Sequence, residues 1–276
     1  MLEVQKYLLE HGFEKLHDEY EIDITYGPDN LIILNYSQIG SKSLKFHPII
    51  RECRSLCLEN KTWKLISKAF NRFFNLGEYP EGEAIFDWEN SVCEEKVDGS
   101  HISLFWWNGQ WRIITRSSFA DGSPHPDYKG TWASLFEEAL GKKFLELDSL
   151  KYLDKDSNYI FELGSPWNQV VVHHPYPRLW LLTGFNKKTY QEFDQQQLYD
   201  SAKYLGAEQL IQFPFKNPAQ VQEYFNTCVH KGNEFEGVVF KDKNFNRIKV
   251  KHIEYLRLHK IRGTGAFLNK DILPLI

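Results

Sequence analysis

Short runs in which apolar and polar residues alternate recur along the chain, and each one predicts a β-strand. The clearest run, 101–116, carries Asn108-Gly109 at its centre, the dipeptide most typical of a two-residue hairpin turn. Such a turn would pair His101 with Arg116 at the open end of the hairpin. The pattern over 21–36 predicts a second hairpin. Further strands are expected at 159–163, 170–173, 179–185, 237–240 and 247–251.

Apolar residues spaced three or four positions apart predict helices in other segments. A short helix over 1–12 would end at Gly12, and a later one would begin at Asn217-Pro218, an N-cap followed by proline at the first helical position. The expected helices beyond the first are 131–140, 194–205 and 217–230. Strands and helices do not alternate regularly, and hairpins recur. The sequence therefore predicts an α+β fold with largely antiparallel sheets and flanking helices.

The stretch EEKVDGSHISLF, residues 94–105, places Lys96 two residues before the turn that begins at Asp98-Gly99. One interpretation is a solvated lysine at a strand end, beside a turn that Asp and Gly favour. The other is a nucleophilic lysine that the turn presents to a substrate. A Lys-x-Asp-Gly match occurs by chance in about one chain in twenty of this length. The stretch alone does not decide between the two.

A basic strand follows near the end of the chain. Arg247, Lys249 and Lys251 alternate with apolar residues, so their side chains should point to one face. An exposed edge strand would explain them, because edge lysines discourage pairing with other chains. The alternative is that the three cations surround an anion.

The preceding stretch FEGVVF should pair with this strand as a hairpin. A four-residue loop over 242–245 would place Glu236 opposite Lys251, whereas a five-residue loop would place Gly237 there. We favour the first register because it pairs opposite charges.

Composition and charge limit the classes of protein to which the chain can belong. The 276 residues carry a net charge of −4 and are 42% hydrophobic, as expected for a globular protein with a full core. Residues 241–262 hold eight Lys or Arg and two Asp or Glu, which leaves −10 on the rest of the chain. A basic segment on an acidic body favours one cationic site for a phosphate-bearing ligand, and a solvated helix end is the alternative.

Nothing in the sequence indicates a membrane or an oxidising compartment. The apolar runs are too short to span a bilayer, and the N-terminus does not resemble a signal peptide. The cysteines have no metal-ligand spacing, so reduced thiols and a cytoplasmic location are expected. These cysteines are Cys53, Cys57, Cys93 and Cys228.

Five segments taken together resemble the covalent nucleotidyltransferase superfamily of polynucleotide ligases and mRNA-capping enzymes. In chain order they are KVDGS, ITRSSF, IFELGSP, FEGVVF and KVK. Three further features narrow the resemblance to the phage T4 RNA ligase 1 family: ECRS at 52–55, NRFFNLGE at 71–78 and the tyrosine in KVKHIEY. The similarity runs from about residue 50 to 255.

This resemblance implies an ATP-dependent RNA ligase with Mg²⁺ or Mn²⁺ as cofactor. A lysine takes AMP from ATP, passes it to an RNA 5′-phosphate, and a 3′-hydroxyl then displaces AMP to seal the strand. A lysine amine is almost wholly protonated at neutral pH, so nearby cations and the metal must favour its neutral form. A capping guanylyltransferase, a DNA ligase and an inactive nucleic-acid-binding relative are the alternatives.

The resemblance also implies roles for individual residues. Lys96 is the nucleophile and Phe161 stacks on adenine. Glu162 faces the ribose or a metal ion, and Glu236 faces the metal ion or the lysine. Glu94 meets the adenine amino group. The other implied residues hold ATP or RNA phosphates, or shape and support the turn that presents the lysine: Lys249, Lys251, Arg54, Arg72, Arg116, Asp98, Gly99 and Tyr255.

Two positions depart from the family pattern. Arg72 stands where lysine is usual, which keeps the charge but changes the phosphate geometry, and Ser55 stands where glycine is usual. We expect residues 1–276 to form one adenylation domain, with 1–90 as an N-terminal part carrying accessory phosphate-binding residues. Only about twenty residues follow Tyr255, so neither an OB domain nor a large helical C-terminal domain is expected. RNA with 5′-phosphate and 3′-hydroxyl ends is the expected partner, with a separate kinase/phosphatase to heal damaged ends.

Overall fold

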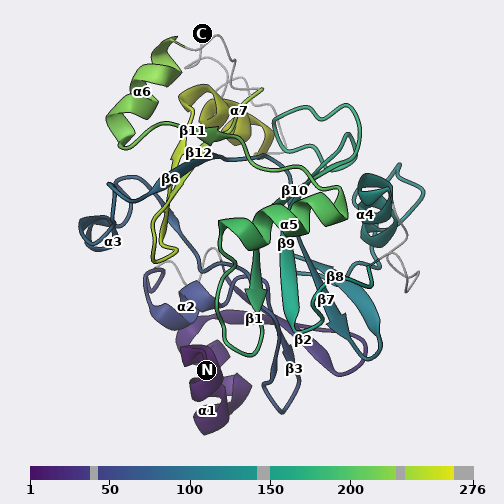
Figure 1. Ribbon diagram of the computed structural model, residues 1–276. Helices are drawn as coiled ribbons and strands as arrows, with labels where there is room; N and C mark the ends of the chain where they lie inside the picture. Colours follow the sequence, from purple (N-terminus) through teal and green to yellow (C-terminus); the bar gives the residue numbers. More distant parts are fainter. Residues whose placement is uncertain (38–42, 142–149, 228–233, 264–276) are drawn as a thin grey trace. The chain divides into compact units, whose positions relative to one another are not determined.

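The computed structural model divides the chain into two compact units, each built from segments distant in sequence (Figure 1). It describes residues 1–37, 43–141, 150–227 and 234–263. Unit 1 comprises 1–72, 100–163 and 178–209, and unit 2 comprises 73–99, 164–177 and 210–276. Each helix in the described part of the chain is too short or too polar to cross a bilayer.

Unit 1 contains two four-stranded sheets, ordered β1-β2-β3-β4 and β10-β9-β7-β8. The strands are β1 (Ile22–Tyr26), β2 (Leu31–Tyr36), β3 (Leu56–Glu59), β4 (Leu65–Ser67), β7 (Ser100–Trp107), β8 (Gln110–Thr115), β9 (Ser157–Gly164) and β10 (Arg178–Asn186). The helices are α1 (Glu3–Tyr20), α2 (Pro48–Glu52), α4 (Trp132–Leu140) and α5 (Gln195–Leu205). Leu31, Ile33 and Ile66 of the first sheet pack with Phe105 and Ile114 of the second, which gives the unit a shared core.

Unit 2 is built on a five-stranded sheet ordered β11-β6-β12-β13-β5. Its strands are β5 (Phe74–Asn75), β6 (Val92–Glu95), β11 (Gln212–Phe213), β12 (Gly237–Lys241) and β13 (Arg247–Lys251). Its helices are α3 (Pro80–Ala84), α6 (Pro218–Thr227) and α7 (Ile253–Gly263). Val221 and Phe225 of α6 pack with Val238, Phe240 and Ile248 of the sheet. Because β13 lies between β12 and β5, the edge-strand interpretation of the three cations is wrong.

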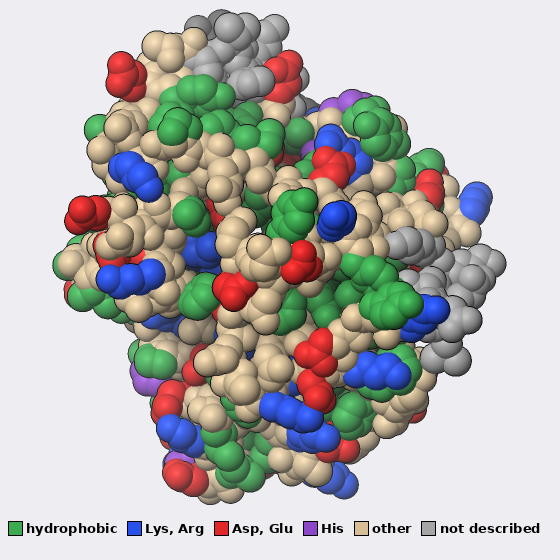
Figure 2. All heavy atoms as spheres, in the orientation of Figure 1, with side chains coloured by type: hydrophobic (Ala, Val, Ile, Leu, Met, Phe, Trp, Pro, Cys, Tyr) green, Lys and Arg blue, Asp and Glu red, His purple; other side chains and the backbone are tan. Residues whose placement is uncertain are grey.

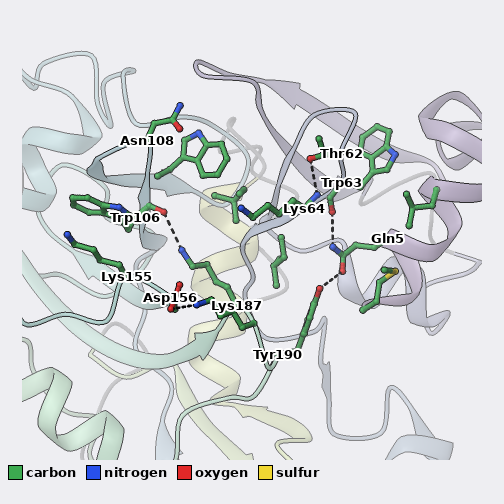
Figure 3. A pocket seen from close by; sticks show the side chains of 16 residues that line it. Gln5, Thr62, Trp63, Lys64, Trp106, Asn108, Lys155, Asp156, Lys187 and Tyr190 are labelled. Carbon is green, nitrogen blue, oxygen red and sulfur yellow. Dashed lines mark hydrogen bonds and ion pairs between the residues drawn. The ribbon is translucent and has the colours of Figure 1, made fainter.

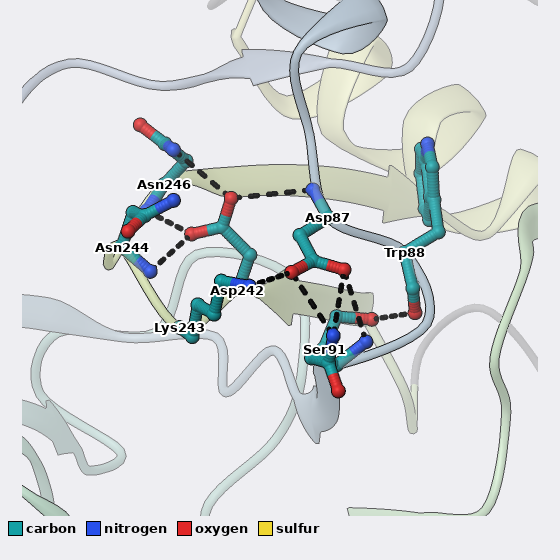
Figure 4. Close-up of polar contacts among 8 residues, drawn as sticks. Asp87, Trp88, Ser91, Asp242, Lys243, Asn244 and Asn246 are labelled. Atoms are coloured by element: carbon teal, nitrogen blue, oxygen red, sulfur yellow. Dashed lines mark hydrogen bonds and ion pairs between the residues drawn. The ribbon is translucent and has the colours of Figure 1, made fainter.

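The register favoured for the last hairpin is also wrong. Gly237, not Glu236, lies opposite Lys251, and the loop has five residues. The carboxylate of Asp242 causes this: it accepts hydrogen bonds from the backbone N–H groups of Asn244 (2.9 Å) and Asn246 (2.8 Å), as Figure 4 shows. An aspartate that bonds the backbone ahead of it stabilises a particular turn, so it sets the loop length here.

The other local predictions have mixed outcomes. The Asn108-Gly109 hairpin and the hairpin over 21–36 are confirmed. The predicted helix stop at Gly12 is confirmed: its non-helical φ of 77° and ψ of 178° separate two helical stretches, which together make up α1 and run to Tyr20. The predicted strand at 170–173 does not form, because the N–H groups of Val171 and Val172 bond to a carboxylate instead.

The capped helices are confirmed: Thr131 and Asp194 accept hydrogen bonds at the starts of α4 and α5, and α6 begins at Pro218. The predicted end of this last helix and Cys228 lie outside the described residues. The other three cysteines are buried free thiols.

Candidate active site

In unit 2, a buried carboxylate joins two of the predicted lysines. Glu236 is 3% exposed, and its two oxygens lie 2.8 Å from Nζ of Lys96 and 2.7 Å from Nζ of Lys251. Burial by itself raises the pKa of Glu236, but the charges and hydrogen bonds of the two lysines outweigh it and hold the pKa below its ordinary value. The group is therefore an anion held between two ammonium groups, with a net charge of +1.

The sheet brings these three groups together. Lys96 directly follows β6, and its N–H donates to the carbonyl of Gly237 at 2.8 Å. Glu236 directly precedes β12, and its carbonyl accepts from the N–H of His252 at 2.9 Å. Gly237 has φ of 148°, and a Cβ there would overlap the carbonyl oxygen of Val250. Only glycine allows the two strands to approach this closely next to Glu236.

Asp98 is tied to the protein rather than open to a ligand. Its side chain accepts hydrogen bonds from the N–H groups of Val171 and Val172, both at 2.7 Å, and from the hydroxyl of Tyr255 at 2.8 Å. Asp98 is 5% exposed and Tyr255 is 2% exposed. Three donors on one carboxylate fix the turn that follows Lys96.

Two further contacts extend this network. The Nε2 atom of His174 lies 2.8 Å from the carbonyl oxygen of Asp98, and the Nζ of Lys251 lies 5.0 Å from the ring centroid of Tyr255. Tyr255 therefore connects the turn after the predicted nucleophile with one of the predicted phosphate-binding lysines. Nothing local in the sequence marks His174, because its partner lies 76 residues away.

Lys249 and Glu94 also have protein partners in unit 2. The Nζ of Lys249 donates to the carbonyl of Phe73 at 3.4 Å and lies 5.3 Å from the centroid of its ring. The carboxylate of Glu94, expected to meet adenine, is buried and lies 3.3 Å from Nζ of Lys241.

The basic segment 241–262 is accordingly not one patch of solvated cations. Lys243 pairs with Asp87 at 2.8 Å, Arg257 pairs with Glu254 at 2.5 Å, and Arg262 donates to the carbonyl of Val170 at 2.7 Å. On the face seen in Figure 2, blue and red side chains are interspersed. Much of the excess charge in this segment therefore lies beside acidic or carbonyl groups.

In unit 1, the three predicted arginines lie against aromatic rings. The guanidinium carbons of Arg72 and Arg116 are 4.2 and 4.9 Å from the centroid of the Tyr36 ring, and that of Arg54 is 4.4 Å from the centroid of Phe70. At these distances the cation–π contact with a ring restrains each planar guanidinium group, whose N–H donors lie in its own plane. Such groups suit phosphate oxygens.

A buried histidine belongs to this arginine cluster. Burial lowers the pKa of His101 well below its ordinary value, and the charges of Arg54 and Arg116 lower it further, so the ring is neutral. His101 lies opposite Glu162 across β7 and β9, which places the half-buried Glu162 beside the cluster in the sheet.

Phe161 lies on the opposite face of β9 from Glu162. It is fully buried, and its ring contacts that of Phe136 edge-on at 5.4 Å between centroids. This position in the core gives it a packing role in unit 1, and its predicted stacking on adenine stays a prediction.

Ser55, one of the two departures from the family pattern, adopts φ of 54°, in the region that favours glycine. Its N–H donates to Oδ1 of Asn35 at 2.9 Å and its hydroxyl donates to the carbonyl of Thr115 at 3.1 Å. These two bonds stabilise a conformation that glycine would adopt without strain.

The predicted site residues thus form two clusters, one in each unit. Within the described residues, no group of three or more His, Cys, Asp or Glu side chains could hold a metal ion. Both oxygens of Glu236 already contact ammonium groups, so its predicted role as a metal ligand stays a prediction.

Comparison with known proteins identifies the family. Residues 52–255 match a family model described as RNA ligase. The chain belongs to the RNA ligase family. The match includes Lys96, Glu236 and Lys251 together with the three arginines of unit 1.

Relatives of this RNA ligase family member are found among curated proteins and solved structures. A predicted bifunctional polynucleotide kinase/RNA ligase of Autographa californica nuclear polyhedrosis virus is 32% identical over an alignment of 274 positions, which covers 94% of this chain and 38% of that protein. The chain spans between 38% and 60% of the length of the curated relatives that it matches.

Two solved structures share the fold. An archaeal ATP-dependent RNA ligase has a TM-score of 0.59 and 13% identity, covering 95% of this chain and 67% of that one. A predicted ATP-dependent DNA ligase from Aquifex aeolicus has a TM-score of 0.60 and 13% identity, covering 98% of this chain and 70% of that one. The predicted α+β fold is confirmed, and it is the fold of these two ligases.

Proposed function

We propose that this member of the RNA ligase family is an ATP-dependent RNA ligase that joins 5′-phosphate and 3′-hydroxyl ends through a lysyl-AMP intermediate. The observation that carries the proposal is the placement of Lys96 at a fixed turn, bonded to a buried Glu236 that also holds Lys251. A structural ion pair would need only one lysine. A second cation beside the first suits a reaction in which negative charge develops on phosphate.

The first step requires Nζ of Lys96 to lose its proton and attack the α-phosphorus of ATP. A P–N bond forms, and pyrophosphate leaves. Glu236 holds Nζ in place, Asp98 and Gly99 shape the turn, and Tyr255 fixes Asp98. Lys249 and Lys251 are the candidates to bind the phosphates. Mg²⁺ or Mn²⁺, which we expect to arrive with the ATP phosphates, would supply further neutralisation of their charge.

In the later steps AMP passes to an RNA 5′-phosphate, and a 3′-hydroxyl displaces it. The stacked guanidinium groups of Arg54, Arg72 and Arg116 are suited to the phosphates of ATP or of RNA. On this proposal residues 1–276 act as one adenylation domain, and 1–90 supplies accessory phosphate contacts. Damaged ends would need a kinase/phosphatase, and the name of the viral relative includes a polynucleotide kinase.

Covalent labelling tests the proposal. Incubation with α-labelled ATP and Mg²⁺ should give a labelled protein band on a denaturing gel, and Lys96→Ala should abolish it. The matched control, Lys243→Ala, removes an exposed lysine of unit 2 and should label normally. The Lys96 variant should still join RNA that already carries a 5′-adenylate, because that step bypasses the nucleophile.

The same assay separates the alternatives. Labelling with GTP in place of ATP would indicate a capping guanylyltransferase, and sealing of DNA but not RNA would indicate a DNA ligase. Undiminished labelling of Lys96→Ala would contradict the assignment of the nucleophile, and no labelling with any nucleotide would favour a binding protein.

A further inference from the structure

Unit 1 contains a cavity of about 480 Å³ that the proposed reaction does not use. Its wall is formed by side chains of α1, of residues 62–66 in and before β4, and of residues 106–108 at the turn after β7. The loops around 155 and 187–190 complete it. The volume lies in the range of small-ligand sites, about 300–1,000 Å³. Figure 3 shows side chains that line the cavity, from several separate segments of the chain.

Lysine ammonium groups lie close to indole rings in the wall of this cavity. The Nζ of Lys155 lies 3.9 Å from the ring centroid of Trp106, and that of Lys64 lies 5.7 Å from the centroid of Trp107. The Nζ of Lys187 donates to the backbone carbonyl of Trp106 at 3.3 Å. Figure 3 shows Lys155 running alongside Trp106, with Lys187 reaching toward the same residue.

The charge of the wall is unbalanced. Its charged side chains are four lysines and one carboxylate, and that carboxylate, Asp156, pairs with Lys188 at 2.5 Å. Burial lowers the pKa of Lys187 to about 8, with Lys64 adding to the effect, while Asp156 and Asp154 oppose it. An anion that enters the cavity would therefore neutralise the excess charge and favour the charged form of Lys187.

The cavity is separate from the arginine cluster of the same unit. Trp107 is at the turn end of β7, whereas His101, which borders that cluster, is at the start of the strand. Six residues of extended strand separate them, a distance of roughly 20 Å. One nucleotide cannot span that distance, so the cavity is not part of the same phosphate site.

We propose that this cavity binds one nucleotide of a single-stranded RNA, with its base against the indole rings and its phosphate against Lys64, Lys155 and Lys187. Planar aromatic surfaces beside cations are what single-stranded nucleic acid requires, because every base can stack and every linkage is an anion. The choice of RNA among polyanions rests on the proposed ligase function. The site would hold the strand away from its reacting end.

Binding measurements on the full chain test this. Fluorescence anisotropy with an end-labelled single-stranded RNA of about twelve nucleotides should show about tenfold weaker binding for Lys64→Gln/Lys155→Gln, and a log-log salt slope shallower by about 1.4 for two lost phosphate contacts. Both lysines are exposed, so the double variant should fold. The matched control is Lys129→Gln/Lys203→Gln, which removes two exposed lysines of unit 1 outside the cavity and should bind like the parent.

Additional probes identify the ligand. Trp107→Leu should weaken binding of RNA more than binding of an abasic ribose-phosphate strand of equal length, because only the former stacks. Tighter binding of free AMP than of the oligonucleotide would overturn the proposal in favour of a mononucleotide site. If the variants lost binding of an acidic peptide but kept binding of RNA, the proposal would be overturned in favour of a protein partner.

Lysyl-AMP labelling of the same variants keeps the two proposals apart. Normal labelling together with unchanged RNA binding in the Lys64/Lys155 variant would refute the RNA site and leave the ligase function standing. Equal weakening in the control double variant would also refute it, since general electrostatics would then explain the effect. If the Lys64/Lys155 variant lost RNA binding but the parent protein formed no lysyl-AMP, the RNA site would be supported and the ligase function would be refuted.

Discussion

Replacing Tyr255 by phenylalanine should weaken the turn that presents Lys96. The tyrosine hydroxyl lies 2.8 Å from Oδ1 of Asp98, and both residues are almost fully buried, so water cannot replace the lost donor. A hydrogen bond to a charged group contributes about 1.5–3 kcal/mol, and the carboxylate keeps its two backbone donors. We therefore expect the free energy of unfolding to fall by about 2 kcal/mol.

The consequence for the reaction follows from the position of Asp98, two residues after Lys96. A turn that is less well fixed should slow lysyl-AMP formation, while RNA joining from a pre-formed 5′-adenylate should be less affected. Denaturant titration gives the stability, and single-turnover labelling with ATP gives the rate. Tyr152→Phe is the matched control, because that tyrosine is 75% exposed and lies in unit 1.

Combining the substitution with Asp98→Asn tests the contact itself. If the two residues act through one hydrogen bond, the double variant should lose less stability than the sum of the single losses. Additive losses, or a Tyr255→Phe protein as stable and as fast as the parent, would refute this account of the turn.

Three other predictions concern charge and close packing. Glu236→Gln should destabilise the protein by about 1–3 kcal/mol at neutral pH. The lowered pKa of Glu236 gives stability that is present above its ordinary value of 4.5 and is lost as the pH falls. The parent should therefore lose this advantage over the variant in acid titrations below that value. Gly237→Ala should cost about 2 kcal/mol or more and abolish labelling, whereas Gly122→Ala, with no atom near its Cβ, should be neutral in both assays. Burial lowers the pKa of Lys187 to about 8 from 10.5, so the unfolded chain binds more protons than the folded chain between these pH values. In pH-dependent unfolding, the stability of the parent relative to Lys187→Met should therefore rise across that window by up to about 3 kcal/mol.

Local signals in the sequence predicted the elements well where one short segment determined them. The Asn108-Gly109 turn fixed the register of β7 and β8, and the side chains of Thr131 and Asp194 fixed the starts of α4 and α5. The family motifs then indicated which side chains belong to the candidate site. Each of these signals spans only a few residues, so no distant partner was needed to read it.

Predictions failed where a distant or hidden partner decided the outcome. The strand expected at 170–173 is absent because Asp98, more than seventy residues earlier, bonds its N–H groups. The favoured β12–β13 register is wrong because the turn that Asp242 makes sets the loop length, and Glu236 and Lys251 form their ion pair without lying opposite each other. The cavity of unit 1 was not predicted, because its lysines come from separate segments that no pattern connects.

The ion pairs of Glu236 also change what the reaction requires. The attack on ATP requires cations near Lys96 that favour its neutral form, whereas the resemblance also allows Glu236 to face the lysine. In the structure a carboxylate oxygen lies 2.8 Å from Nζ of Lys96, and this contact stabilises the ammonium instead. The same carboxylate holds Lys251, whose Nζ also lies 5.0 Å from the centroid of the Tyr255 ring. A phosphate that draws Lys251 toward itself would leave Glu236 with Lys96 alone and strengthen that pair, so phosphate binding by Lys251 cannot by itself release the amine. The proton must leave against the attraction of Glu236, and for this reason Glu236→Gln should shift the pH dependence of lysyl-AMP formation toward lower pH, even where it lowers the maximal rate.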